Sequence, residues 1–300
     1  MPWKARSRER PPQVPEPGGR RVPQVDARIA RRRFERAAAT YRKAARLEEE
    51  IGARMLERLD YVKLAPRRVL DAGSGPPQRA LGKRYPEAEV VALDFALAML
   101  RARKKKLFER RTVKAIGADM AKMPIAPGAI DLVWSNMALH WAADPLAALR
   151  EFHRVLAVGG LLMFSTLGPD TLAELRQAAG GARVHAFVDM HDLGDMLVAA
   201  GFAEPVMDAE RVTMLYEDGA ALLADLRASG QTFAQAAPAG AARRGLAGRG
   251  FRSALVERLA AQRRDGKLAV RYEVVYGHAW KPAPRLAPDG RAIVQFARRS

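Results

Sequence analysis

A short glycine-rich segment offers the first residues with a chemical use. Asp71-Ala72-Gly73-Ser74-Gly75 follows the apolar pair Val69-Leu70 and precedes a helical pattern through Leu81. Glycines directly after a buried strand let a ligand approach the backbone where a Cβ would obstruct it. A GxG pattern alone is weak evidence, but its place between a strand and a helix favours a nucleotide-like ligand.

Two further carboxylates stand where the next strands are expected to end. Asp94 follows the strand pattern 89–93, and Asp119, next to Met120, follows the pattern 113–116. Asp94 could accept hydrogen bonds from both hydroxyls of a ribose. Asp119 could take the exocyclic amine of an adenine while Met120 covers the ring. The structural alternatives are a helix cap at Asp94 and a turn cap at Asp119.

An alternation of apolar runs and helical patterns positions these residues. Strands are expected at 69–71, 89–94, 113–116, 131–134 and 161–165, and helices through Leu81 and near 98–107 and 145–156, the last one breaking at Gly159-Gly160. Continuous apolar runs between helices are typical of parallel strands buried on both faces. A helical stretch of one or two helices precedes them at 26–59.

The pattern changes after Thr166. Helices are expected at 170–178 and at 192–200, where Gly201 ends the second one, and strands at 210–216 and 268–280. Residues 217–266 indicate two inserted helices joined by an Ala/Gly/Arg-rich segment at 238–250.

Between residues 65 and 166 the chain resembles the class I S-adenosylmethionine-dependent methyltransferases. Besides the acidic strand ends, the resemblance rests on Ile130–Val133 and Leu156–Gly160. It implies an α/β, Rossmann-like fold with a seven-stranded, mostly parallel sheet, helices on both faces and an inserted helical lid. It also implies that S-adenosyl-L-methionine is the cofactor and that the cofactor is bound by Asp71, Ala72, Gly73, Ser74, Gly75, Asp94, Phe95, Asp119, Met120, Asn136 and Met137.

The positions at which related families carry a third glycine refine this assignment. A dinucleotide-dependent dehydrogenase is disfavoured, because its fingerprint would place a third glycine near Arg79. Many class I methyltransferases carry a third glycine where this chain has Pro77. Proline lacks an N–H and fixes φ, so the amino-acid part of the cofactor is expected to be gripped differently.

The wider pattern resembles the malonyl-acyl-carrier-protein methyltransferases of biotin synthesis over residues 30–282. The loop Ser135–Trp141 lacks the Asn-Pro-Pro-aromatic motif of enzymes that methylate base amino groups. Four stretches carry the resemblance: Phe34–Tyr41, Ser135–Trp141 with Asp144-Pro145, Phe164–Leu172 and Tyr272–Trp280. The resemblance implies methylation of the free carboxylate of a malonyl thioester, carried by acyl carrier protein or coenzyme A.

A carboxylate acceptor is already ionised at neutral pH, so this chemistry needs alignment and exclusion of water rather than a general base.

From the matching helix, Tyr41 is the candidate for shaping the acceptor pocket, and His140 and Trp141 are candidates for lining it. The alternatives are a core tyrosine and a packed histidine. A buried arginine is expected to hold the acceptor carboxylate, and the sequence does not choose among Arg183, Arg211, Arg227, Arg243 and Arg244.

Composition excludes some classes of protein. The chain has no cysteine, which excludes disulfides, thiolate zinc sites and cysteine catalysis, and its five histidines lack the usual metal-ligand spacings, so no metal is expected. There is no continuous apolar span and no apolar signal segment, so a cytoplasmic protein without a membrane span is expected.

A net charge of +18 attracts polyanions or belongs to a solvated surface. The resemblance implies an acidic acyl carrier protein rather than nucleic acid as the partner, with Arg101–Lys106 and Arg110-Arg111 as candidate docking charges.

The expected organisation is a disordered basic tail at 1–25, a methyltransferase domain at 26–282 and a C-terminal tail at 283–300. Within the domain we expect helices at 26–60, the cofactor-binding core at 65–166, lid helices at about 168–190 and 217–266, and the last strand at 268–280. Two other functions stay open. One is a related enzyme acting on another small carboxylate or a protein side chain. The other is a non-catalytic basic binding protein with a degenerate cofactor site.

Overall fold

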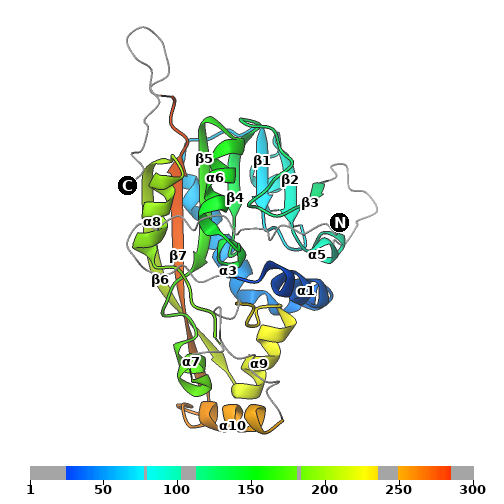
Figure 1. Ribbon diagram of the computed structural model, residues 1–300, viewed down its shortest axis with the longest axis vertical. Helices are drawn as coiled ribbons and strands as arrows, with labels where there is room; N and C mark the ends of the chain where they lie inside the picture. Colours follow the sequence, from blue (N-terminus) through cyan, green and yellow to red (C-terminus); the bar gives the residue numbers. More distant parts are fainter. Residues whose placement is uncertain (1–24, 78–79, 103–112, 181–183, 236–248, 285–300) are drawn as a thin grey trace, which may run out of the picture.

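The computed structural model describes residues 25–77, 80–102, 113–180, 184–235 and 249–284, and its strands form one sheet (Figure 1). The strand order is β3-β2-β1-β4-β5-β7-β6, and among these strands only β7 runs in the direction opposite to the others. The strands are β1 (Arg68–Ala72), β2 (Glu89–Asp94), β3 (Lys114–Gly117), β4 (Ile130–Ser135), β5 (Leu156–Leu167), β6 (Ala203–Tyr216) and β7 (Leu268–Trp280). The predicted seven-stranded, mostly parallel sheet is confirmed.

Helices flank this sheet on both faces. They are α1 (Ala27–Ala37), α2 (Tyr41–Ala44), α3 (Arg46–Arg58), α4 (Ala80–Arg84), α5 (Leu97–Arg101), α6 (Pro145–Val155), α7 (Ala173–Ala179), α8 (Met190–Ala199), α9 (Gly219–Ala228) and α10 (Arg249–Ala260), with short 3-10 helices η1 (Leu59–Tyr61) and η2 (Leu139–Trp141). In the part of the chain that the structure describes, none of them is long and apolar enough to cross a bilayer.

Alternation along the strands divides the core into two layers. In β1, Val69 packs in the cluster that contains Ile51 of α3, whereas the next residue, Leu70, packs with Phe152 of α6. All four side chains are fully buried. Burying each of them contributes about 1.5–3 kcal/mol, which fixes the register of the strand ends that carry the acidic residues.

The N-terminal helical stretch is broken more often than predicted. It forms α1, α2 and α3 in place of one or two helices, with interruptions at residues 38–40 and at Ala45. Asp26 caps α1 by accepting hydrogen bonds from the N–H groups of Arg28 and Ile29 at 2.9 and 3.1 Å. Alanine and threonine fill the first break, and neither is a residue that ends a helix on its own.

Two strands are longer than predicted. β5 begins at Leu156 and runs through the two glycines that we expected to precede it. Gly159 donates to the carbonyl of Lys281 and Gly160 accepts from its N–H, both at 2.9 Å. β6 begins at Ala203 rather than 210; Glu204, with φ +51°, and a register shift before Val206 hide its start.

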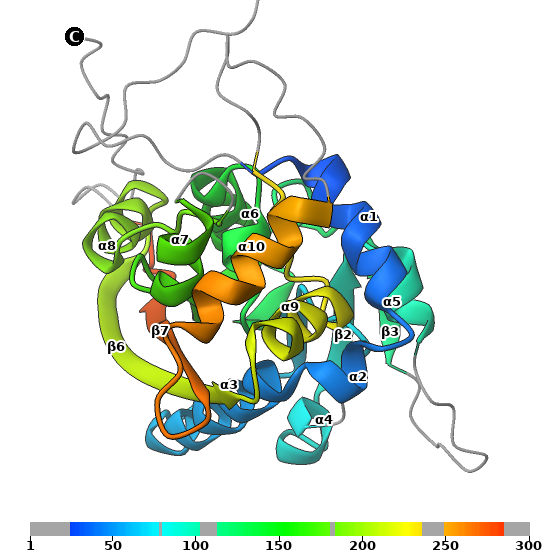
Figure 2. The ribbon, with the colours of Figure 1, turned by 90° about the horizontal axis from the view of Figure 1, so that it is seen from below.

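β6 and β7 continue past the rest of the sheet as a two-stranded ribbon. β5 pairs with β7 only from Trp280 to Val274, whereas β6 stays paired to Leu268. Helices α7, α9 and α10 gather at the free end of the ribbon (Figures 1 and 2). The two inserted helices expected between residues 217 and 266 are therefore confirmed.

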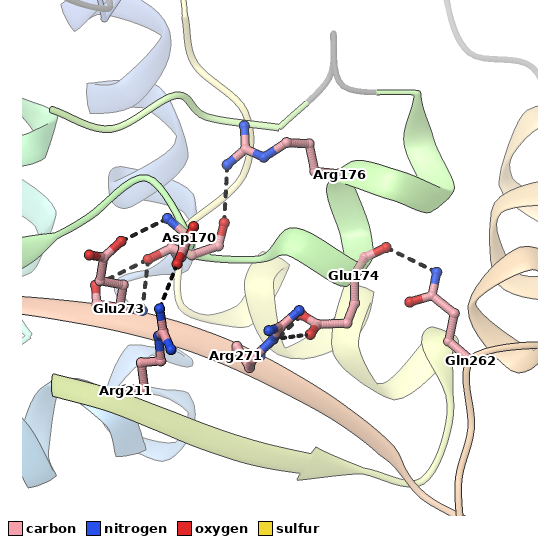
Figure 3. A network of polar contacts seen from close by, with 8 residues as sticks. Asp170, Glu174, Arg176, Arg211, Gln262, Arg271 and Glu273 are labelled. Atoms are coloured by element: carbon pink, nitrogen blue, oxygen red, sulfur yellow. Dashed lines mark hydrogen bonds and ion pairs between the residues drawn. The ribbon is translucent and has the colours of Figure 1, made fainter. Parts of the chain in front are cut away.

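A network of charged side chains fastens the first of these helices to the ribbon (Figure 3). Glu174 of α7 accepts from Nε of Arg271 at 2.7 Å and from its N–H at 3.1 Å. Thr171 and Glu273 exchange two hydrogen bonds of 3.1 Å. These contacts join two of the stretches singled out in the sequence, Phe164–Leu172 and Tyr272–Trp280.

Several predictions fall outside the described residues. They are the tails at 1–24 and 285–300, the basic residues at 103–106 and 110–111, the linking segment at 236–248, and three of the candidate arginines, Arg183, Arg243 and Arg244.

Candidate active site

A cleft opens at the carboxyl ends of the parallel strands, the edge where ligands bind in open α/β sheets. The strand ends and their loops form its floor, and side chains of α1 and α2 form its roof. The lining residues are Ala27, Phe34, Tyr41, Gly73, Gly75, Leu93, Asp94, Phe95, Met99, Ala118, Asp119, Met120, Met137, Ala138, Trp141, Ala142 and Ala143. Most of the predicted cofactor residues thus meet in one place.

The glycine-rich turn has the geometry that makes glycine necessary. Gly73 and Gly75 have φ of +74° and +59°, in the left-handed region. A Cβ on Gly73 would lie 2.3 Å from Cβ of Ala138, which no relaxed structure tolerates. The N–H groups of Gly73 and Ser74 both donate to the carbonyl of Leu93, at 2.8 and 3.0 Å, and so tie the turn to β2.

Asp94 is a buried carboxylate at the cleft floor. Its Oδ2 accepts from the N–H of Gly75 at 2.9 Å and its Oδ1 from the N–H of Ala96 at 2.7 Å. Ala96, not Asp94, is the N-cap residue of α5, so the helix-cap alternative does not describe Asp94. Burial raises the pKa of Asp94 to about 6, although both hydrogen bonds act in the opposite direction.

A second buried carboxylate, Asp71, lies within electrostatic reach of the first. Burial, and then the charge of Asp94, raise the pKa of Asp71 to about 7. Two buried carboxylates with raised pKa values favour a ligand that brings positive charge and hydrogen-bond donors, because such a ligand offsets the free-energy cost of ionising them.

Asp119 and Met120 lie together on another wall of the cleft. Asp119 accepts from the N–H of Ala121 at 2.9 Å, so it does cap a turn, and its side chain also lines the cleft. The methyl group of Met120 is 3.5 Å from the position of a Cβ on Gly73. The apolar side chain of Met120, beside the hydrogen-bond-accepting carboxylate of Asp119, suits a flat aromatic ring that carries an amino group.

The roof over the turn is aromatic. Tyr41 lies over Gly75, whose Cβ would be 3.4 Å from Cε1 of the tyrosine. Burial first, and then Glu48 and the cleft carboxylates, raise the pKa of Tyr41 well above its usual value, so its hydroxyl stays protonated. Phe34 meets the edge of Trp141 with ring centroids 5.0 Å apart.

Four predicted cofactor residues lie behind the lining rather than on it. Asp71 and Ala72 are buried in β1, and Ser74 Oγ donates to the carbonyl of Gly75 at 3.0 Å. Asn136 donates to the carbonyl of Glu48 and accepts from Ser165 Oγ, both at 2.8 Å.

Met137 does line the cleft, and its φ of +52° is a strained conformation for this residue type. Such strain clusters at functional sites.

His140 and Trp141 separate in the structure. Trp141 lines the cleft, whereas His140 lies behind it, with Nδ1 3.2 Å from Thr166 Oγ1 and Nε2 buried without a partner among the described residues. Burial and then His185 lower the pKa of His140 to about 3, so the ring is neutral. Its neighbours are the rings of Trp141 and Phe187.

A segment that sequence reasoning missed closes the roof. Residues 228–235, which we call the strap, begin at the last residue of α9 and run across α1. Thr40 Oγ1 donates to the carbonyl of Ala228 at 2.7 Å, and the N–H of Asp26 donates to the carbonyl of Ala234 at 2.7 Å. The N–H of Ala234 donates to His185 at 2.9 Å.

The strap also contacts a buried acid that sequence reasoning did not identify. Gln231 donates a side-chain hydrogen bond to Glu48 of α3. Burial raises the pKa of Glu48 to about 7. The only signal in the sequence was an acidic residue at a position of α3 that faces inward, between Leu47 and Ile51.

No arginine is among the described residues that line the cleft. Of the candidates that the structure describes, Arg211 pairs with Asp170 at 3.1 Å on the ribbon (Figure 3), and Arg227 is exposed near the end of α9. In the same ranges no three histidine or acidic side chains gather in a metal-binding arrangement.

Comparison with known proteins identifies relatives over nearly the whole chain. The family model of the methyltransferase domain matches residues 70–164. The malonyl-[acyl-carrier protein] O-methyltransferase of Gallionella capsiferriformans is 50% identical, over 90% of this chain and 96% of its own. That of Laribacter hongkongensis is also 50% identical, over 91% and 96%.

Solved structures share the fold at low sequence identity. The YcgJ protein of Bacillus is 15% identical with a TM-score of 0.56, covering 77% of this chain and 99% of its own. The BH2331 protein of Bacillus halodurans is 18% identical with a TM-score of 0.54, covering 76% and 97%. The sheet is that of a Rossmann-like methyltransferase.

Proposed function

Since the chain belongs to the malonyl-[acyl-carrier protein] O-methyltransferase family, we propose that it methylates the free carboxylate of malonyl-acyl carrier protein, with S-adenosylmethionine as methyl donor. The observation that carries the proposal is the cleft itself. It combines a glycine turn without room for a Cβ, the buried carboxylate of Asp94 with that of Asp71 behind it, and an aromatic roof at one edge of the sheet.

The residues present fit this cofactor. Asp94 would accept from the ribose hydroxyls, Asp119 and Met120 would hold the adenine, and Asp71 would face the positive charge of the amino-acid part. Phe95 and Met137 complete the lining. When bound, S-adenosylmethionine would supply a methyl group on a positively charged sulfur, an electrophile suited to a carboxylate oxygen.

The chain's own residues have to orient the acceptor and exclude water. Tyr41 stays protonated and stands over the turn, so its hydroxyl is available as a donor to the acceptor. Trp141 and Phe34 form an apolar wall, with His140 behind it. The strap covers this wall, and no general base is needed because the acceptor is already ionised.

Pro77 does not argue for a degenerate site. Proline removes one N–H from the loop, but Arg42 of α2 donates to the carbonyl of Pro77 at 3.3 Å. The loop is therefore fastened to the roof beside Tyr41. This hydrogen bond supports a cofactor-binding loop that α2 holds in place, rather than a loop that no longer binds a cofactor.

The test is methyl transfer in vitro from S-adenosylmethionine to malonyl-acyl carrier protein, malonyl-coenzyme A and free malonate. We expect the carrier-bound thioester to be the best acceptor and free malonate to be inert. Growth without biotin of a strain that lacks its own malonyl methyltransferase would place the product in biotin synthesis. Turnover with none of the three acceptors, at saturating cofactor, would refute the proposal.

A further inference from the structure

We propose that the outer face of α1, marked by Arg28, Arg32 and Arg36, is the docking surface for the acidic carrier protein. The inference rests on the proposed function for the identity of that partner. The three arginines, which we call the α1 stripe, are exposed and stand at i, i+4 and i+8, so they share one side of the helix.

The α1 stripe is charge that the fold does not use. Within the described residues none of the three arginine side chains has a hydrogen bond or an ion pair, whereas the side chain of the adjacent Arg31 pairs with Glu35 at 3.0 Å. Between residues 26 and 46 the chain has eight basic and two acidic side chains, a formal net charge of +6.

This arrangement opposes helix formation. Like charges four residues apart destabilise a helix, and a cation in the first turn opposes the helix dipole. The first turn of α1 holds no acidic residue and contains Arg28, whereas Arg36 lies in the last turn, where a cation complements the dipole. As a row, these arginines destabilise the helix, and their side chains make no internal hydrogen bond or ion pair among the described residues. Such a row of cations is expected where a binding partner supplies the matching anions.

The stripe lies one helix away from the cleft. The opposite side of α1 provides Ala27 and Phe34 to the cleft lining, and an α-helix is about 10–12 Å across with its side chains. A carrier held on the stripe would stay outside the molecule, with its acyl arm beside the mouth of the cleft. Figure 2 shows α1 at the outer edge of the molecule, next to α5.

The surface is also held in place. The cap at Asp26 and the bond from Asp26 to Ala234 fix the start of α1, and Gly230 of the strap packs against Phe34, whose Cδ1 is 3.0 Å from the position of a Cβ there. A fixed surface reduces the entropic cost of association. Exposed Lys43 extends the positive surface from α1 to α2, toward Tyr41.

The experiment reverses the charge of the α1 stripe in one variant and the charge of a matched surface in another. The test variant is R28E/R32E/R36E. The control is K63E/R67E/R68E, which makes the same charge change with exposed residues at the amino end of β1, away from the cleft. Binding of malonyl-acyl carrier protein is measured by calorimetry at low and moderate salt, and steady-state kinetics are measured with the carrier-bound and the coenzyme A thioesters.

We expect the stripe variant to bind the carrier at least about 10-fold more weakly, to lose most of the salt dependence, and to keep its KM and kcat for malonyl-coenzyme A within about 2-fold. The control variant should bind like the unmodified protein. Equal weakening in both variants, unchanged carrier affinity in the stripe variant, or equal loss with both thioesters would each overturn the docking surface.

The proposed function fails separately. If neither thioester is methylated but the carrier still binds in a stripe-dependent manner, the reaction is wrong and the surface stands. If the unmodified protein does not bind the carrier, or binds nucleic acid through the stripe in preference to it, the docking proposal falls whatever the catalytic result.

Discussion

The floor and the roof of the cleft are built from different kinds of contact. The floor consists of backbone turns and carboxylates held by neighbouring strands, such as Asp94 and Gly75, which are 19 residues apart. The roof consists of rings and amides that join distant segments, such as Glu48 and Gln231, 183 residues apart. The floor is thus shaped by main-chain geometry, and the roof by the packing of side chains from both ends of the chain.

This difference separates two tasks. A rigid, acidic floor suits a cofactor of fixed structure and positive charge. A roof assembled from side chains of α1 and α2 and covered by the strap stands over the cofactor floor without being part of the strand ends, so it is free to be shaped for the acceptor. Changes in the floor should therefore act on cofactor affinity, and changes in the roof on the acceptor.

The largest effect is expected from Asp94→Ala. Hydrogen bonds to a charged group contribute about 1.5–3 kcal/mol each, so losing two from the ribose hydroxyls should weaken S-adenosylmethionine binding by at least about 100-fold. Calorimetry measures this directly. Asp208→Ala, which removes an exposed acid paired with Arg58 on the ribbon, is the control. Full affinity in Asp94→Ala would show that the floor does not hold the cofactor in this way.

Gly73→Ala should be the next most damaging change. The left-handed conformation and the contact with Ala138 together should lower the free energy of unfolding by about 2–4 kcal/mol. Gly128→Ala is the matched control, because its φ is +68° but nothing lies within 4 Å of the added Cβ. Denaturant midpoints compare the two, and equal losses would mean that the close packing of the turn is unimportant.

Glu48→Gln tests how the roof responds to pH. The pKa of Glu48 is about 7 in the folded protein, against about 4.3 in an unfolded chain. The folded state therefore keeps a proton that the unfolded state releases, and stability falls as pH rises from about 4 to 7. Glutamine should remove this pH-dependent change in stability, about 3–4 kcal/mol in total.

Thermal unfolding between pH 4.5 and 8 measures that slope. Glu49→Gln, an exposed neighbour, should leave it unchanged. A slope that persists in Glu48→Gln would assign the effect to the floor acids Asp71 and Asp94, whose pKa values are also raised.

The smallest effect is expected from Thr40→Val. It removes the hydrogen bond to Ala228 and with it one tie between α2 and the strap, at a cost of about 1 kcal/mol. The KM for malonyl-acyl carrier protein should rise a few-fold while S-adenosylmethionine affinity stays unchanged. Thr213→Val, on the exposed side of β6, is the control. A loss of S-adenosylmethionine affinity in Thr40→Val would contradict the prediction that the roof acts on the acceptor and the floor on the cofactor.

The floor could be predicted because its requirements are local. Positive φ demands glycine, and strands buried on both faces demand apolar runs, so Gly73 and the strand ends at Asp71 and Asp94 stand out in the sequence. The last strand was predicted at its observed bounds, 268–280, and Gly201 was correctly identified as the end of α8.

The family resemblance pointed to Tyr41 and Trp141, but the contacts that hold the roof could not be predicted, because they depend on which distant segments meet. Nothing local indicates that Gln231 reaches Glu48 or that Asp26 bonds to Ala234. The same holds for the early starts of β5 and β6, which neighbouring strands impose on residues of weak β propensity such as Gly159 and Glu204.

The position of β7 has a consequence for synthesis of the protein. Of the strands that the structure describes, β7 is synthesised last, yet it lies between β5 and β6. Until residues 268–280 emerge, β5 presents an open edge and β6 has no partner, and open edges invite pairing with other chains. The nascent chain can form its parallel half early, but it must be protected from aggregation until its final strand arrives.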